Sequence, residues 1–213
     1  MPVLAYCVTT AEVALKVAQT GVAGMTVESV DESGLRCFVS RRESELPMSS
    51  LATREEALAF HSVLQELFRQ TTIIPFRFPT LLADEALSAH LREHAGQYRD
   101  TLARLKNMVQ MEIHLGFGIA ESPESLNVSG TQYLRRRQGQ RRELEELAER
   151  FREAGAIRSW RKRDSARGVR CFALVQREGI ADFQRQAAGV TVGSEIGVRV
   201  TGPWPPTEFL KEK

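Results

Sequence analysis

The spacing of hydrophobic residues predicts strands and helices in a repeating order along this chain. Residues Val3–Thr9 (VLAYCVT) form a nearly continuous apolar run, which is typical of a strand buried on both faces. In residues 109–117, apolar side chains instead alternate with polar or small ones, which predicts a strand with one dry and one wet face. The apolar positions are Val109, Met111, Ile113, Leu115 and Phe117, and the others are Gln110, Glu112, His114 and Gly116.

The first 80 residues are predicted to fold in the order βαββαβ. A short helix over Ala11–Gln19 follows the first strand and ends before Gly21. Thr53 and Glu56 form a capping box, which opens a second helix that runs to about Gln70. The remaining strands are the two arms of a hairpin, at Met25–Asp31 and Leu35–Ser40, and the segment 71–78 (TTIIPFRF), whose proline indicates an edge strand or a strand end.

The same order is predicted again in the second half of the chain. Asp84 begins a long helix whose apolar stripe ends at Leu105, and we interpret this helix as a connector. After the strand at 109–117, a helix is expected over about 129–154 and another over 180–188. Strands are expected at 157–161, 169–176 and 195–201. The sequence therefore predicts an α+β fold of two tandem ferredoxin-like (βαββαβ) domains, residues 1–106 and 107–213, each with helices on one face of an antiparallel sheet.

The helix predicted over 129–154 has an unusual distribution of apolar residues. No large apolar side chain occurs between Leu134 and Leu144, so the middle of the helix has nothing to pack on its own sheet. Either Gly139 interrupts the helix, or its N-terminal part projects into solvent and makes coiled-coil-like contacts. Leu144, Leu147 and Phe151 would then hold only its C-terminal end.

Composition and net charge do little to narrow the class of protein. The net charge is +2 and 42% of the residues are hydrophobic, as in an ordinary globular protein without a strong overall field. The chain shows no signal-peptide pattern and no apolar run long enough to span a bilayer, so we expect a cytoplasmic protein without membrane insertion. Cys7, Cys37 and Cys171 lie far apart in apolar segments and are expected to be buried, reduced thiols.

Candidate catalytic and metal-binding groups are sparse. His90 and His94 have the i, i+4 spacing of two metal ligands on a helix, but no third ligand is evident nearby. His61 has Ser62 and Glu66 close by, yet the chain offers neither a nucleophile elbow nor paired carboxylates in a defined loop. We therefore expect no enzymatic activity, no metal and no cofactor.

Two short segments combine proline with large aromatic side chains and predict recognition of a partner. They are residues 71–80 (TTIIPFRFPT) and residues 201–209 (TGPWPPTEF). The candidate partner-binding residues are Phe76, Arg77, Phe78 and Trp204. Strand alternation would direct both phenylalanine rings into the core and the Arg77 guanidinium to the open side of the sheet. There it would form an ion pair with the other domain or contact a bound protein.

A basic region forms the strongest charge feature. Residues 135–170 contain 13 Lys and Arg against 6 Asp and Glu, an excess of 7 positive charges. The region is a solvated face, a surface for an acidic protein, or a nucleic-acid site. RNA-recognition domains share the βαββαβ order, but here Val169 and Cys171 replace the expected aromatic residues, and Glu112 would repel phosphates. Nucleic-acid binding through residues 135–170 is the alternative function.

Taken in order, several segments resemble the gas vesicle synthesis protein family GvpL/GvpF. They are the helix start at His61, the strand Ile74–Phe78 with Thr80, the strand carrying Glu112, the segment 129–134 (SGTQYL), and the closing segment 201–206 (TGPWPP). Pro79 and Thr207 stand where the family usually has a glycine and an aromatic residue.

This resemblance implies a modified ferredoxin-like N-terminal domain and an α+β C-terminal domain with a protruding helical part. It also implies an accessory role in gas vesicle assembly, in which the protein associates with the gas vesicle, binds the small hydrophobic shell subunit and works with other gas vesicle accessory proteins. It implies no catalytic residues.

Overall fold

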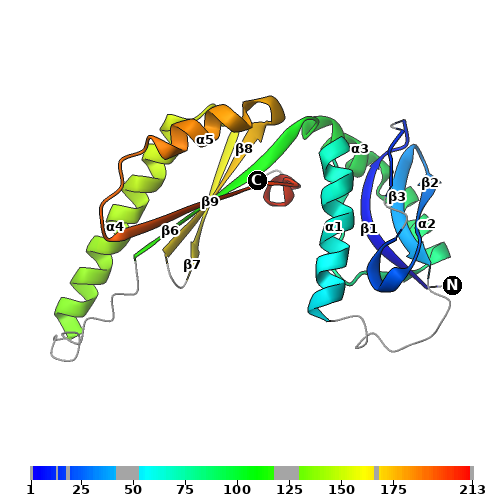
Figure 1. The fold of residues 1–213 in the computed structure, drawn as a ribbon, viewed down its shortest axis with the longest axis horizontal. Helices are drawn as coiled ribbons and strands as arrows, with labels where there is room; N and C mark the ends of the chain where they lie inside the picture. Colours follow the sequence, from blue (N-terminus) through cyan, green and yellow to red (C-terminus); the bar gives the residue numbers. More distant parts are fainter. Residues whose placement is uncertain are drawn as a thin grey trace. The chain divides into compact units, whose positions relative to one another are not determined.

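The computed structural model describes residues 2–12, 14–17, 20–41, 53–117, 130–165 and 168–211. The chain divides into two compact units: the first unit comprises residues 1–107 and 205–213, and the second unit comprises residues 108–204 (Figure 1). Each unit contains one antiparallel sheet, and the described residues form five α-helices. The sequence placed all of 107–213 in the second domain, whereas residues 205–213 group with the first unit.

The first unit is built around β1 (Pro2–Thr10), the most deeply buried strand of its sheet. The strand order is β2-β3-β1-β4, with β5 also paired to β1. These strands are β2 (Val27–Glu32), β3 (Leu35–Arg41), β4 (Ile74–Pro75) and β5 (Leu81–Ala83). Seven consecutive residues of β1, Val3–Thr9, are buried, as the continuous apolar run predicts.

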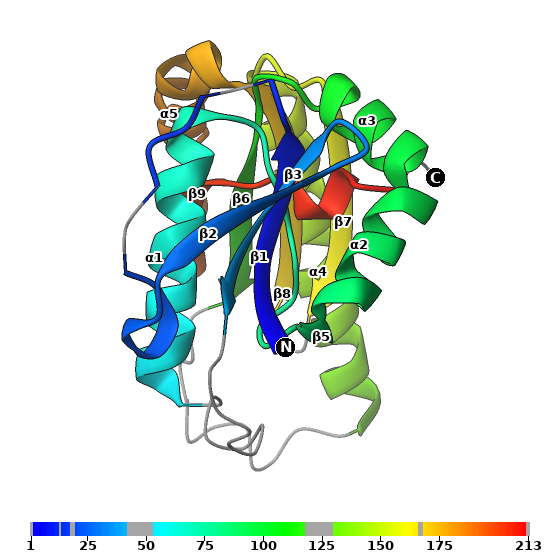
Figure 2. The same ribbon diagram turned by 90° about the vertical axis from the view of Figure 1, so that its right-hand side faces the viewer.

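Helices cover both faces of the first sheet, which corrects the prediction of a single covered face (Figure 2). Helix α1 (Arg54–Gln70) packs on one face, where the rings of Phe60 and Tyr6 stack at 5.0 Å. Its predicted capping box is present, with Thr53 and Glu56 each accepting a hydrogen bond from the other's backbone. On the opposite face, Leu87 and Leu91 pack in one buried cluster with strand residues such as Val3 and Cys37.

The predicted connector helix is two helices that form a layer of the first unit. Helix α2 (Asp84–Glu93) ends at His94, whose backbone (φ −102°, ψ 10°) is not helical, and α3 (Ala95–Arg104) begins directly after it. The apolar stripe found in the sequence therefore packs on the first sheet.

The short helix predicted over Ala11–Gln19 is wrong for the residues that the structure describes there. Residues 14–17 have no regular structure. The backbone of Lys16 is instead hydrogen-bonded to the Gln70 side chain of α1: the Lys16 N–H donates to Oε1 (2.9 Å) and the Lys16 carbonyl accepts from Nε2 (2.7 Å). A helix would need those groups for its own i→i−4 bonds, so the tertiary contact replaces it.

A buried tyrosine holds the segment that leads into β2. Residues Val22–Gly24 form a single 3₁₀ turn, η1, close to Tyr6 of β1. The Tyr6 hydroxyl accepts a hydrogen bond from the Val22 N–H (3.0 Å) and lies 3.0 Å from the Ser40 hydroxyl. The side chains of Tyr6, Val22 and Ser40 are all fully buried. A Cβ on Gly21 would come within 2.2 Å of the Tyr6 oxygen, so this approach requires glycine.

The second unit has the chain order β6, α4, β7, β8, α5, β9. Its sheet has the strand order β7-β8-β6-β9, made of β6 (Met108–Phe117), β7 (Ser159–Ser165), β8 (Gly168–Gln176) and β9 (Ile196–Trp204). Helices α4 (Gly130–Ala154) and α5 (Ile180–Ala188) pack on the same face of this sheet (Figure 1). Val109, Met111, Ile113 and Leu115 of β6 are buried, as the alternating pattern predicts.

Helix α4 is continuous through Gly139 and spans 25 residues, roughly 37 Å at about 1.5 Å per residue. Its C-terminal half is anchored by the buried side chains of Leu144, Leu147 and Phe151. None of the described side chains in its N-terminal half is buried, and Leu134 is 61% exposed. Of the two interpretations left open by the sequence, the uninterrupted helix is correct.

The last residues of the chain pack in the first unit. The Arg104 guanidinium of α3 donates to the carbonyl of Phe209 (2.9 Å), in the 3₁₀ turn η5 (Thr207–Phe209). Phe209 is buried, and Leu210 packs against the cluster that contains Leu87 and Leu91. Two antiparallel sheets with helices are thus confirmed. The finer prediction of tandem ferredoxin-like domains is not confirmed, because the described residues of the first unit show only the 3₁₀ turn η1, and no α-helix, between β1 and β2.

Candidate functional site

The segment 76–80 forms a loop at one edge of the first sheet. Phe76 N–H donates to the carbonyl of Tyr6 (2.8 Å), and the carbonyl of Thr80 accepts from Ala5 N–H (3.0 Å). Both ends of the loop are therefore held against β1, while residues 77–79 lie between these two attachments. The Thr80 hydroxyl also donates to the Arg77 carbonyl within the loop.

The two aromatic rings of this loop lie on opposite faces of the sheet. Phe78 contacts Phe60 of α1, with ring centroids 5.0 Å apart. Phe76 packs against the buried cluster on the α2 and α3 side, where its ring centroid lies 6.4 Å from that of His90. Both rings pack in the interior of the first unit, as expected, but not on one face of its sheet, because β4 ends at Pro75 and strand alternation does not extend to Phe78.

Arg77 lies exposed between these two half-buried rings. No ion pair or side-chain hydrogen bond joins its guanidinium to any residue in the described part of the chain. Of the two roles expected from the sequence, the internal ion pair therefore finds no support among those residues. This edge of the sheet therefore presents an exposed guanidinium between two half-buried aromatic rings.

His90 and His94 belong to a cluster of half-buried rings at α2 and α3, in which the ring planes are tilted or edge-on to one another. His90 Nε2 lies 2.9 Å from the Tyr98 hydroxyl, and His94 Nδ1–H donates to the His90 carbonyl (3.0 Å) at the break between the helices. Burial lowers the pKa of His90, with a further contribution from the neighbouring His94. Among the described residues, no group of three or more His, Cys, Asp or Glu side chains is arranged to hold a metal.

The Ser62 hydroxyl and the three cysteine thiols are hydrogen-bonded or buried. The Ser62 hydroxyl donates to the Leu58 carbonyl of its own helix (3.0 Å), as exposed helical serines often do. The three cysteines are free and buried, and Cys7 and Cys37 lie on the adjacent strands β1 and β3. Burial raises the pKa of the Cys37 and Cys171 thiols to about 12, so both stay protonated at neutral pH.

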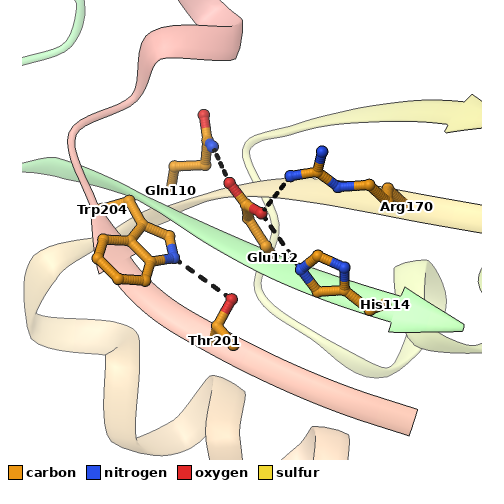
Figure 3. A network of polar contacts seen from close by, with 6 residues as sticks. All are labelled: Gln110, Glu112, His114, Arg170, Thr201 and Trp204. Atoms are coloured by element: carbon orange, nitrogen blue, oxygen red, sulfur yellow. Dashed lines mark hydrogen bonds and ion pairs between the residues drawn. The ribbon is translucent and has the colours of Figure 1, made fainter. Parts of the chain in front are cut away.

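The second sheet carries a polar network on the face opposite α4 and α5 (Figure 3). Glu112 of β6 is its centre and is largely buried, with 16% of its side chain exposed. Its carboxylate accepts from Gln110 Nε2 (2.9 Å) and from the Arg170 guanidinium of β8 (2.9 Å), and lies 3.4 Å from His114 Nε2. The cross-strand register produces this grouping, because Arg170 faces His114 directly across the sheet.

The groups around His114 shift the pKa of its imidazole in opposite directions. Burial lowers its pKa, the nearby Arg170 and Arg199 lower it further, and Glu112 acts in the opposite direction. The net shift is downward, so the imidazole is neutral at pH 7. The sequence placed His114 on the wet face but did not reveal this network, because cross-strand partners are unknown until the register is known.

Trp204, the fourth predicted partner-binding residue, lies at the end of β9. Its indole N–H donates to the Thr201 hydroxyl (3.3 Å), and the ring is half-buried. Trp204 belongs to the second unit, whereas Phe76, Arg77 and Phe78 belong to the first.

Many cations of the basic region 135–170 are paired with acids. The pairs are Arg141 with Glu145 and Asp164, Arg142 with Glu146, Arg152 with Glu149, Lys162 with Glu149, and Arg170 with Glu112. Arg167 lies outside the described residues. Phe172, an aromatic residue on the face of Glu112, is 2% exposed and lies under Arg163 and Arg170. A nucleic-acid base would need an accessible ring to stack on, so this face does not favour the alternative function.

Two sheet-and-helix units with these edge and surface groups define a mixed α/β protein with two antiparallel sheets. The family described as gas vesicle synthesis protein GvpL/GvpF matches residues 2–211, and the chain therefore belongs to this family of gas vesicle accessory proteins.

Two solved structures are similar to the chain over its whole length. The gas vesicle protein GvpF from Microcystis aeruginosa has 15% sequence identity and a TM-score of 0.79, covering 99% of each chain. GvpF from Anabaena sp. PCC7120 has 13% identity and a TM-score of 0.78, covering 100% of this chain and 99% of that one. At these identities the likeness shows the fold. No curated protein sequence gives a significant match.

No helix in the described part of the chain is long and apolar enough to cross a membrane.

Proposed function

We propose that this protein is a non-enzymatic accessory factor of gas vesicle assembly that binds the small hydrophobic shell subunit in the cytoplasm. The observation that carries the proposal is the family match over residues 2–211, which spans both units. A small, very apolar subunit released alone would associate through its exposed surface. A globular protein that covers part of that surface keeps the subunit available for assembly.

The edge of the first sheet is the surface that we assign to this contact. The loop 76–80 presents an exposed arginine between two half-buried phenylalanine rings, which is a composition enriched in protein interfaces. An apolar partner would extend the contact that Phe76 and Phe78 begin, while Arg77 would pair with a polar or acidic group beside the apolar segment. Trp204 is a further candidate contact, in the second unit.

Capture of the shell subunit tests this assignment. The tagged full-length chain and its Arg77→Ala variant are each expressed with the shell subunit and recovered on the tag, and the bound subunit is quantified. We expect Arg77→Ala to reduce the recovered subunit at least fivefold, because an arginine at the centre of an interface commonly contributes more than about 1 kcal/mol. Its melting temperature should stay near that of the parent, since surface substitutions usually change stability by less than about 0.5 kcal/mol.

Arg69→Ala is the matched control. Arg69 is an exposed arginine of the first unit, in the last turn of α1, and removing it makes the same change in net charge. It should capture the subunit as the parent does. If Arg77→Ala and Arg69→Ala retain equal amounts of subunit, the sheet edge is not the contact surface. If the parent chain itself recovers no shell subunit, the proposed binding function is wrong.

A further inference from the structure

A row of basic side chains crosses the open face of the second sheet, opposite α4 and α5. The strand register defines this basic row: Arg163 of β7 pairs with Arg170 of β8, Arg170 pairs with His114 of β6, and His114 pairs with Arg199 of β9. Directly paired residues of neighbouring strands have their side chains on the same face of a sheet. The basic row therefore presents three guanidinium groups and one imidazole side by side, and all three arginines are exposed.

Two of these guanidinium groups lie over one aromatic ring. The guanidinium carbons of Arg163 and Arg170 are 5.9 and 5.3 Å from the ring centroid of Phe172, which belongs to the next row of the same face. Because the face of an aromatic ring attracts cations, Phe172 offsets part of the repulsion between the two neighbouring charges. Arg170 is further oriented by its 2.9 Å hydrogen bond to Glu112 (Figure 3). Both guanidinium groups are thus held in place before a partner binds.

Arg199 occupies the other end of the basic row. Within the described part of the chain, no ion pair or hydrogen bond to its side chain is found. Its charge still acts on the neighbouring residue: burial lowers the pKa of the His114 imidazole, and Arg170 and Arg199 lower it further. The Arg199 guanidinium therefore offers hydrogen-bond donors to an anion at this end of the row.

The charges on this face do not cancel. A fourth arginine, Arg161, pairs with Phe172 in the row beside the basic row. Within the described strands β6 to β9, Glu112 is the one acid on this face, so the strands carry an excess of three positive charges while His114 is neutral. Glu195, in the turn that precedes β9, would reduce this excess only to two. A partner that covers the face must supply several negative charges, since burying unpaired cations is costly.

The space beside the basic row is open. In the next row of the same face Gly116 pairs with Gly197, so neither β6 nor β9 places a side chain there. A hollow of about 600 Å³ borders these glycines together with His114, Arg170 and Arg199. Glycine permits the close approach of another backbone. A polypeptide can therefore lie along the basic row without displacing side chains of the sheet.

The length and chemistry of the basic row favour an acidic polypeptide. Neighbouring strands lie about 4.8 Å apart, so the row is roughly 14 Å long, or about four residues of extended chain at about 3.3 Å each. Alternate side chains of such a chain point the same way, so carboxylates at i, i+2 and i+4 match three guanidinium groups. A single-stranded nucleic acid gains much of its binding by stacking bases on aromatic rings, and the ring of Phe172 is inaccessible, since the residue is 2% exposed.

We propose that the basic row binds an acidic segment of a partner polypeptide, whose carboxylate side chains pair with Arg163, Arg170 and Arg199. A planar guanidinium group donates two parallel hydrogen bonds to a carboxylate. Of the three roles that the sequence left open for residues 135–170, this is the binding of an acidic protein, and Arg199 extends the surface beyond that region. The basic row lies in the second unit, whereas the edge assigned to the shell subunit lies in the first, so the two proposals can fail independently.

Titration of the ¹⁵N-labelled full-length chain tests this surface. The probe is acetyl-Glu-Ser-Glu-Ser-Glu-amide; its neutral counterpart has Gln in place of Glu, and the oligonucleotide d(TTTT) carries the same charge on its phosphodiesters. The amide signals of Gly116 and Gly197, beside the row, report binding. We expect the acidic peptide to shift both signals in a saturable manner, to bind more tightly than the oligonucleotide, and to lose affinity as the salt concentration rises from about 20 to about 150 mM. The Gln peptide should have no effect.

Substitutions at the two ends of the row test which residues bind the peptide. Arg199→Gln should raise the dissociation constant of the acidic peptide about threefold, the size expected for one exposed ion pair. Arg163→Gln combined with Arg199→Gln should raise it about tenfold, since the two sites are far enough apart for their free-energy effects to add. The matched control is Arg150→Gln combined with Arg158→Gln, which removes the same charge from two exposed arginines of the second unit outside the row. The control should bind like the parent, and every variant should keep the parent's melting temperature within a few degrees.

Three results would overturn the proposal. If d(TTTT) binds as tightly as the acidic peptide, the basic row is a site for nucleic acid. If the two double variants bind the peptide equally well, the attraction comes from the overall charge of the molecule and not from the row. If the acidic peptide shifts neither glycine signal, the row is a solvated surface that does not take such a partner.

Discussion

The buried hydroxyl of Tyr6 provides a test of how the first unit is held together. In Tyr6→Phe the ring keeps its stack on Phe60, but the Val22 N–H and the Ser40 hydroxyl both lose their partner in a fully buried place. Leaving one buried polar group unsatisfied costs about 1–3 kcal/mol. Because a hydroxyl can rotate towards another acceptor, we expect a total loss of about 2–4 kcal/mol of unfolding free energy, or on the order of 10 °C in melting temperature for a unit of this size.

Urea unfolding followed by far-UV circular dichroism measures this loss. Both tryptophans, Trp160 and Trp204, belong to the second unit, so their fluorescence supplies a separate signal from that unit. Hydrogen exchange of the Val22 amide should also become faster in Tyr6→Phe.

Ser40→Ala is the variant to compare with Tyr6→Phe. It removes the Ser40 hydroxyl as a partner of the Tyr6 hydroxyl but leaves the hydrogen bond from the Val22 N–H to Tyr6 intact. It should cost about 1 kcal/mol, and the double variant should cost no more than Tyr6→Phe alone, since it leaves a single unsatisfied group. The reasoning is refuted if Tyr6→Phe changes the unfolding free energy by less than about 0.5 kcal/mol, or if Ser40→Ala costs as much as Tyr6→Phe.

Two other properties of the molecule can be checked in the same way. Gly139→Ala should stabilise α4 by about 0.5–1 kcal/mol, because alanine is the better helix former and its Cβ would meet no atom within 4 Å; a loss of helicity by circular dichroism would mean that the helix is interrupted there. The lowered pKa of His114 means that the unfolded chain binds its proton more readily, so this group's contribution to stability is present above about pH 6.5 and is lost as the pH falls through the folded-state pKa. The protein should therefore lose less unfolding free energy between pH 7.5 and pH 5 when it carries His114→Gln. The smaller loss that remains includes the contribution of His90, whose pKa is also lowered. An unchanged dependence of stability on pH would contradict this prediction.

The sequence predicted those elements whose patterns depend on local chemistry. The capping box of Thr53 and Glu56, the continuous burial of β1 and the alternation along β6 all occur in the structure. The helix expected at Ala11–Gln19 failed because Lys16 bonds to Gln70, 54 residues away, and no local pattern encodes that contact. The break at His94 was also missed, because the apolar stripe continues across it with the same spacing.

The candidate site was predictable only in part. Phe76, Arg77 and Phe78 do lie at a sheet edge, but the directions of the rings depended on where β4 ends. The grouping of Glu112, His114 and Arg170 depends on the register between β6 and β8, whose residues are 58 positions apart in the case of Glu112 and Arg170. Alternation along β6 indicated which face these side chains would occupy, and nothing in the sequence indicated which residues would face them.

Phe209 and Leu210 belong to the segment 205–213, which completes the hydrophobic interior of a unit whose other residues are 1–107. During synthesis, that interior remains unfinished until residues 205–213 have been made, which happens only after the whole second unit. A fragment ending near residue 107 should consequently aggregate when expressed alone, and should regain a soluble form when a peptide covering residues 205–213 is supplied in trans.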